Sequence, residues 1–67
     1  MNTFPVRLRT LRESRKLSRA ALAGQIGTSE QLVGQWERGV SKPGYVSLEK
    51  LADALGVTLD ALVRGRT

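Results

Sequence analysis

Apolar residues recur along this chain at the spacing of α-helices, and capping residues and glycines separate one apolar group from the next. Near the N-terminus, Phe4, Leu8 and Leu11 stand at i, i+4 and i+7, which places them on one helical face. Proline is tolerated in a first helical turn, so the pattern predicts a helix that begins between Thr3 and Pro5. Thr3 is its expected cap.

A second helix is predicted over about residues 19–25. Ser18 is a suitable N-cap, because its hydroxyl can accept a backbone N–H at the helix start. Gly27 can end this helix, because glycine enters the left-handed C′ conformation without steric cost. The connection to the next helix is short and contains a glycine, which is typical of a helix-turn-helix rather than an antiparallel helical hairpin.

A third helix is predicted over about residues 29–37, with Gly39 just after its end. Val33 and Trp36 stand at i and i+3 and form its apolar stripe. A single tryptophan can also stack on a nucleic-acid base, but this spacing favours a core position for Trp36.

Two further helices are expected near the C-terminus, the fourth starting at Ser47 and the fifth at Thr58, after a turn at Pro43-Gly44. The apolar positions that support them are Leu48, Leu51, Ala52 and Leu55 in the fourth helix and Leu59, Leu62 and Val63 in the fifth. The whole chain, residues 1–67, therefore predicts one compact all-α domain of five helices.

Composition narrows the possible functions. The chain has 67 residues, no cysteine and no histidine, so neither a disulfide nor a conventional metal site is expected. Its acidic residues are scattered over helix surfaces without a pairing pattern, so we do not expect an enzyme, and no cofactor is expected. No apolar run approaches the ~18 residues of a membrane span, and no apolar segment of a secretory signal follows the N-terminal charges. We therefore expect a cytoplasmic protein.

Positive charge is concentrated at the N-terminus. Residues 1–19 hold six basic side chains and one acidic one, whereas residues 20–46 and 47–67 are each balanced. The net charge of the whole chain is +5. A local excess of this kind is typical of a surface that faces a polyanion, although a solvated helix face is the simpler alternative.

The ordered pattern resembles the helix-turn-helix of the Cro and lambda-repressor-like regulators, the XRE family. The resemblance covers about residues 8–63 and rests on Arg12, Leu22-Ala23, Gly27, Val33, Trp36-Glu37, Gly39 and Leu51-Ala52-x-x-Leu55-Gly56-Val57. It implies a sequence-specific regulator of transcription, expected to be a repressor. Such a protein binds an inverted repeat in double-stranded DNA as a homodimer.

The resemblance makes residues 29–37 the recognition helix, whose outer residues enter the major groove. Gln31 and Gln35 are the strongest candidates for base reading, because a glutamine amide can pair with N6 and N7 of adenine. Glu30 can accept a hydrogen bond from cytosine N4 and would also repel phosphates. Gly34 lies on the same expected surface and would allow a close approach to DNA or a partner helix.

Other roles are expected around this helix. At Arg19 the family most often has a glutamine that contacts a phosphate, and arginine can make the same contact with added charge. The charge distribution adds the arginines of the first helix. The expected phosphate contacts are Arg7, Arg9, Arg15, Arg19, Ser29, Ser41 and Lys42.

Two structural roles complete the prediction. The resemblance implies an ion pair between Arg12 and Glu37, and two unrelated surface charges are the alternative. It also places a dimer contact near the last helix, for which Val57, Leu59 and Val63 are the candidates. Closing the core of a monomer is the alternative for these three residues.

Another class of function remains open from the sequence. An antitoxin or adaptor would bind DNA secondarily and hold a protein partner, for which an exposed apolar patch around the fifth helix would be evidence. RNA binding is compatible with the charge, but no RNA-recognition motif supports it.

Overall fold

The computed structural model describes residues 3–65 and contains five α-helices, with no strand in that range. The helices are α1 (Phe4–Ser14), α2 (Arg19–Ile26), α3 (Glu30–Arg38), α4 (Tyr45–Leu55) and α5 (Leu59–Arg64). The predicted all-α fold is therefore confirmed. Helix α1 begins within the predicted range, and the bounds of α2 and α3 differ from the prediction by at most one residue.

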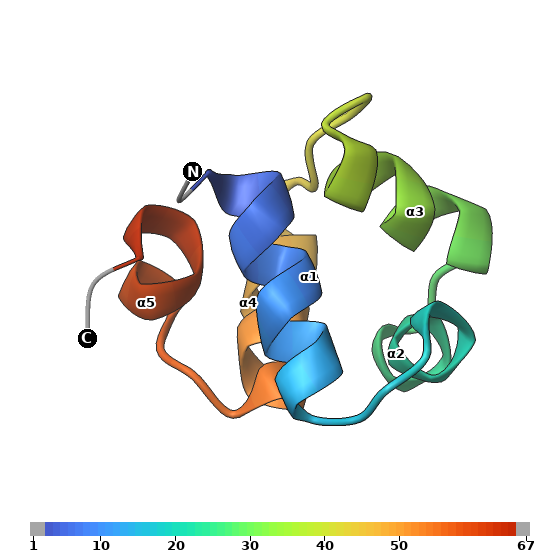
Figure 1. The fold of residues 1–67 in the computed structure, drawn as a ribbon, viewed down its shortest axis with the longest axis horizontal. Helices are drawn as coiled ribbons and strands as arrows, with labels where there is room; N and C mark the ends of the chain where they lie inside the picture. The colour runs from blue at the N-terminus through green and yellow to red at the C-terminus, as the bar shows by residue number, and fades with distance from the viewer. Residues whose placement is uncertain (1–2, 66–67) are drawn as a thin grey trace.

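Helix α1 stands at the centre of the molecule, with α4 behind it in the view of Figure 1. Helices α2 and α3 lie on one side of α1, and α5 lies on the other. Helix α3 contacts both α1 and α2, whereas α5 contacts α1 and α4. This arrangement leaves the outer surface of α3 uncovered by the other four helices.

Side-chain caps begin three of the helices. The hydroxyl of Ser18 accepts a hydrogen bond from the Ala21 N–H at 3.0 Å, and Ser29 accepts one from Leu32 at 3.2 Å. Thr58 caps α5 in the same way, with Ala61 N–H at 3.0 Å. Each cap satisfies a backbone donor that has no partner within the helix, so the local sequence itself sets these starts.

The start of α4 departs from the prediction, and the expected cap of α1 lacks its hydrogen bond. Thr3 stands at the N-cap position of α1, but its side chain makes no capping hydrogen bond. Helix α4 begins at Tyr45 with Gly44 as its N-cap, so the predicted start at Ser47 is wrong. Gly44 takes the extended conformation that an N-cap needs, and α4 therefore starts two residues earlier, with Ser47 inside its first turn.

The connections on either side of α2 depend on left-handed residues. Gly27 ends α2 at φ 74°, as predicted, and its N–H bonds back to the Ala23 carbonyl. Lys16, which follows α1, has φ 57°, a conformation that costs a non-glycine residue free energy. Its N–H reaches the Glu13 carbonyl at 2.9 Å, so a lysine here does what glycine usually does at a helix end.

A single cluster of apolar side chains holds the helices together. Trp36 is 2% exposed, which confirms its predicted core position, and Leu32 is partly buried against the same cluster. The fully packed members are Leu8, Leu22, Ala23, Ile26, Val33, Trp36, Leu51, Ala52, Leu55 and Leu62. Within residues 3–65, none of the helices has the length and apolar character needed to cross a membrane.

Candidate nucleic-acid interface

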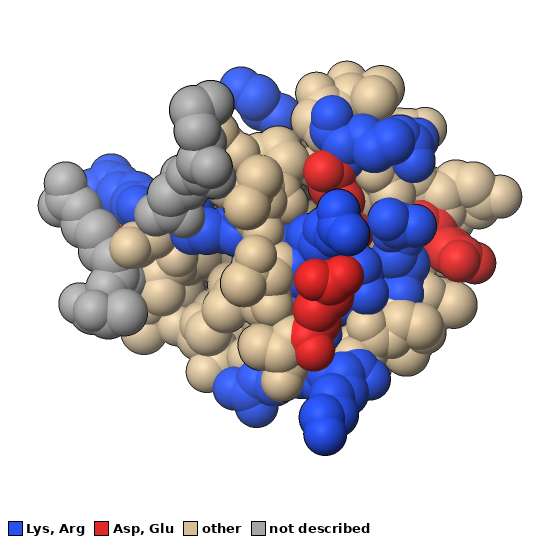
Figure 2. Space-filling view, viewed as in Figure 1, with Lys and Arg blue, Asp and Glu red and all other residues tan. Residues whose placement is uncertain are grey.

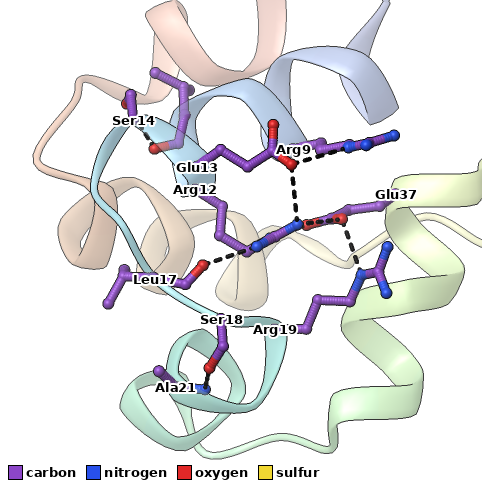
Figure 3. A network of polar contacts seen from close by, with 10 residues as sticks. Arg9, Arg12, Glu13, Ser14, Leu17, Ser18, Arg19, Ala21 and Glu37 are labelled. Atoms are coloured by element: carbon purple, nitrogen blue, oxygen red, sulfur yellow. Dashed lines mark hydrogen bonds and ion pairs between the residues drawn. The ribbon is translucent and has the colours of Figure 1, made fainter.

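Helices α2 and α3 form the expected motif, and an ion pair to α1 fixes how α3 lies. Arg12 Nε donates to Glu37 Oε2 at 2.6 Å, and Arg12 Nη2 donates to Glu37 Oε1 at 3.1 Å. The third nitrogen, Nη1, donates to the Leu17 carbonyl at 2.7 Å (Figure 3). The two side chains are only 9% and 1% exposed. The structure thus contains the Arg12–Glu37 pair, in the bidentate geometry that an arginine fork favours.

Arg19 joins this pair from the start of α2. Its Nε lies 3.1 Å from Glu37 Oε1, so one carboxylate binds two arginines from two different helices (Figure 3). The Arg19 side chain remains 43% exposed, in contrast to Arg12. Glu37 therefore orients Arg19 while leaving part of its side chain open to solvent.

The shared carboxylate is held in its charged form. Burial alone would raise the pKa of Glu37, but hydrogen bonds from Arg12 and Arg19, together with their charges, bring the pKa below its ordinary value. The hydrogen bond to Glu37 also raises the pKa of Arg12, against the opposing effect of burial. At neutral pH the Glu37 carboxylate and the Arg12 guanidinium are therefore both ionised.

The outer face of α3 is polar and forms one wall of a shallow groove. Arg19 of α2 lines this groove with five residues of α3, which are Glu30, Gln31, Gly34, Gln35 and Arg38. Four of these five were expected to be base-reading residues, and the structure brings them together. Arg38 was not expected, although its i+4 position relative to Gly34 places it on the same face.

Gly34 differs from the expectation in one respect. It was predicted to be an exposed residue of the recognition helix, but it is buried. A Cβ atom at this position would lie 3.1 Å from Arg38 Nη1 and 4.0 Å from Arg19 Cδ. The two arginine side chains therefore cover Gly34.

Gln35 is held by the loop that follows α3. The Ser41 hydroxyl donates to Gln35 Oε1 at 3.2 Å, which orients the amide and leaves its NH₂ group available. Ser41 was expected to contact phosphate, but in this structure its proton is used to position Gln35. The pair is half-buried, in contrast to Glu30 and Gln31, which are exposed.

Two arginines of the N-terminal segment bind parts of the protein away from α3. Arg7 Nε donates to the Leu62 carbonyl at 2.9 Å, and its Nη2 donates to the Val63 carbonyl, so the guanidinium lies at the end of α5. Arg15 Nη2 lies 3.5 Å from the Gly56 carbonyl, at the end of α4. A cation at a helix C-terminus is favourable. Arg7 was expected to contact phosphate, but its fork binds α5 and the residue is half-buried.

The other expected phosphate contacts are open to solvent. Arg9 is exposed and pairs with Glu13 at 3.2 Å, one turn along α1. Lys42 is exposed in the loop after α3. Ser29 is exposed at the start of α3, where its oxygen caps the helix. Figure 2 shows basic side chains over several parts of the visible face rather than in one patch.

The three expected dimer residues do not form one surface. Leu59 and Val63 lie one turn apart on α5 and line a groove with Tyr45 of α4, which is 65% exposed. Val57 lines a different groove, between α1 and α5, with Val6 and Thr10. The exposure of Tyr45 shows that it does not belong to the core.

Comparison with known proteins agrees with this geometry. The family model HTH_3, described as "Helix-turn-helix", matches residues 8–62. An uncharacterized HTH-type transcriptional regulator of Bacillus subtilis, YonR, which derives from the SPbeta prophage, is 36% identical over 62 residues. Those residues are 92% of this chain and 57% of the relative. Repressor protein C2 of Salmonella phage P22 is 36% identical over 59 residues, 88% of this chain and 27% of that protein.

A solved structure is similar over nearly the whole chain. It is the P22 c2 repressor protein in complex with a synthetic operator, with a TM-score of 0.93 and 32% identity. The alignment covers 98% of this chain and 100% of that one. The chain spans between about a quarter and somewhat more than half of the two curated relatives, 27% and 57% of their lengths. On its fold and these matches, the chain belongs to the XRE-type helix-turn-helix family of DNA-binding transcriptional regulators.

Proposed function

We propose that this domain represses transcription by binding an inverted-repeat operator in double-stranded DNA, with α3 in the major groove of each half-site. The observation that carries the proposal is the outer face of α3, where polar base-reading side chains lie beside the half-exposed cation of Arg19. A helix in the major groove can distinguish all four base pairs through such side chains. The relative seen with a synthetic operator supports double-stranded DNA as the ligand.

The proposal divides the site into two groups. Glu30, Gln31 and Gln35 discriminate between bases, whereas Gly34 lies beneath the Arg19 and Arg38 side chains and is left out of this group. Arg9, Arg19 and Lys42 supply affinity through phosphates, together with the Ser29 hydroxyl at the start of α3. Arg7, Arg15 and Ser41 are left out of the phosphate group, because their donors bind α5, α4 and Gln35.

The groove between α4 and α5 supports a homodimer. Tyr45, Leu59 and Val63 give it an apolar lining, and exposed apolar surface of this kind commonly marks a protein contact. Two copies on one face of the duplex would bring two recognition helices about 34 Å apart, one turn of DNA. An antitoxin-type or adaptor partner is the alternative occupant. The cytoplasmic location and the lack of enzymatic activity stay predictions.

Selection from a random pool of duplex DNA tests this function. We expect enrichment of one inverted repeat at both low and near-physiological salt, followed by loss of preference at one base pair in Gln31→Ala. Lys42→Ala is the matched control, because a phosphate contact carries no sequence information and its loss weakens binding to all sequences alike. Binding at low salt only, with no enriched sequence, would identify a non-specific electrostatic binder and refute the proposal.

A further inference from the structure

The centre of the outer face of α3 has no side chain of its own, because residue 34 is glycine. The Arg38 side chain takes that place. It starts one turn later, yet its Nη1 lies 3.1 Å from the point where a Cβ of Gly34 would be. The Arg38 guanidinium therefore points back along α3 toward the middle of the helix. It lies in the groove that Gln31 and Gln35 also line.

The donors of Arg38 are available for a ligand. Within residues 3–65, no hydrogen bond or ion pair engages this side chain. Arg19 beside it differs, because Glu37 holds Arg19 Nε at 3.1 Å and draws that cation toward α1. The two arginines over Gly34 thus have different surroundings, one tied to the protein and one open.

We propose that Arg38 reads a guanine at the centre of each half-site, through the space that Gly34 leaves. This rests on the proposed function, in which α3 enters the major groove. An arginine fork donates in parallel to O6 and N7 of guanine, a pattern that only a G·C pair offers. Gln31 and Gln35 on the same face favour adenine, so the preferred half-site has a G·C pair with A·T pairs beside it.

Gly34 is the positioning residue in this arrangement. An added methyl group would be too close to Nη1 and would push the guanidinium away by a few tenths of an ångström. The backbone at Gly34 is not in the left-handed region, so an alanine there is not strained and is a better helix former. Gly34→Ala should therefore change base preference without loosening the helix.

Selection with sequencing on three variants tests the inference. Arg38→Gln should lower the preference for the central G·C pair by about 10-fold while the flanking preferences stay. Gly34→Ala should lower the same preference by a smaller factor, with a melting temperature equal to or above that of the unmodified protein. Lys50→Gln, which removes the same charge from an exposed residue of α4, is the control, and it should keep every base preference.

The outcomes separate the two proposals. If the unmodified protein enriches no sequence, the proposed function fails. If it enriches a repeat and Arg38→Gln keeps the same preference at every position, or loses affinity for all sequences equally, the inference about Arg38 fails. In the double variant, Gly34→Ala should add no further loss at the G·C pair. An additive loss would show that Gly34 does not act through Arg38.

Discussion

At the scale of single residues, Glu37 links three helices through one carboxylate. Its carboxylate accepts from Arg12 on α1 and from Arg19 on α2, and its own backbone belongs to α3. The resemblance implied the first of these contacts. The second was not foreseen, because Arg19 was considered only as a phosphate ligand. A local pattern gives the type of a residue but not the partner that a long side chain reaches in the folded protein.

We expect Glu37→Gln to destabilise the domain by about 3–5 kcal/mol at pH 7, because Arg12 would remain buried without an anion. Since folding lowers the pKa of Glu37, its contribution is complete above its ordinary pKa of about 4.5 and is lost as the pH falls through the folded value. Urea denaturation between pH 3 and 7 measures both effects.

The variant should also show a flatter dependence of stability on pH in the acid range than the unmodified protein. A loss below about 1 kcal/mol at pH 7, the size of a surface ion pair, would contradict a buried network. Glu49→Gln, which alters an exposed glutamate on α4, is the control.

At the scale of helices, the sequence pattern predicted the elements well where a local signal exists. Ser18, Ser29 and Thr58 cap the helices that follow them, and Gly27 ends α2. The start of α4 was missed because Ser47 is a good cap by residue type, while Gly44 gains its role from the backbone of the preceding loop. Arg7 was misplaced for a related reason, since only the packing of α5 against α1 brings its acceptors within reach.

Arg7→Met should loosen α5. This helix has six residues, too few to be stable by itself, and Arg7 donates to the carbonyls of Leu62 and Val63 near its end. We expect a loss of about 1–2 kcal/mol, the size of a cation at a partly buried helix end. Thermal unfolding would detect it as a fall in Tm of several degrees, and amides of α5 should exchange faster with solvent.

Arg9→Met provides the comparison for that experiment. Arg9 is on the same helix and carries the same charge, but its pair with Glu13 is exposed. Its loss should therefore change stability by less than about 0.5 kcal/mol. If Arg7→Met and Arg9→Met changed the free energy of unfolding equally, the contact of Arg7 with α5 would not stabilise the domain.

At the scale of the whole molecule, the positive charge of the N-terminal segment is distributed over several contacts. The sequence interpretation treated it as one excess that faces a polyanion. In the structure Arg7 binds α5, Arg15 lies at the end of α4, and Arg12 is buried against Glu37. Net charge per segment could be predicted from sequence, but the direction of each side chain depends on how the five helices pack.

This distribution predicts the salt dependence of DNA binding. With Arg9, Arg19 and Lys42 on phosphates in each protomer, the slope of log K against log salt concentration should be roughly −5 for a dimer. Lys42→Gln should reduce the magnitude of the slope by about 2, one contact from each protomer. Arg15→Gln removes the same charge and should leave the slope unchanged, because its guanidinium lies over Gly56.

Binding isotherms at several salt concentrations provide the measurement. A salt dependence twice as steep, or an equal change of slope in Lys42→Gln and Arg15→Gln, would mean that Arg15 and Arg7 also contact phosphates. It would also mean that these side chains leave α4 and α5 when DNA binds.

Trp36 has one more consequence. It is the only tryptophan of the chain, it is 2% exposed, and it belongs to the same helix whose outer residues are proposed to meet DNA. Its indole faces the core, on the side of α3 away from that surface. Intrinsic fluorescence will therefore follow the unfolding of the domain and stay nearly constant when DNA is added. Trp36 fluorescence therefore distinguishes a variant that has lost its fold from one that has lost only DNA binding.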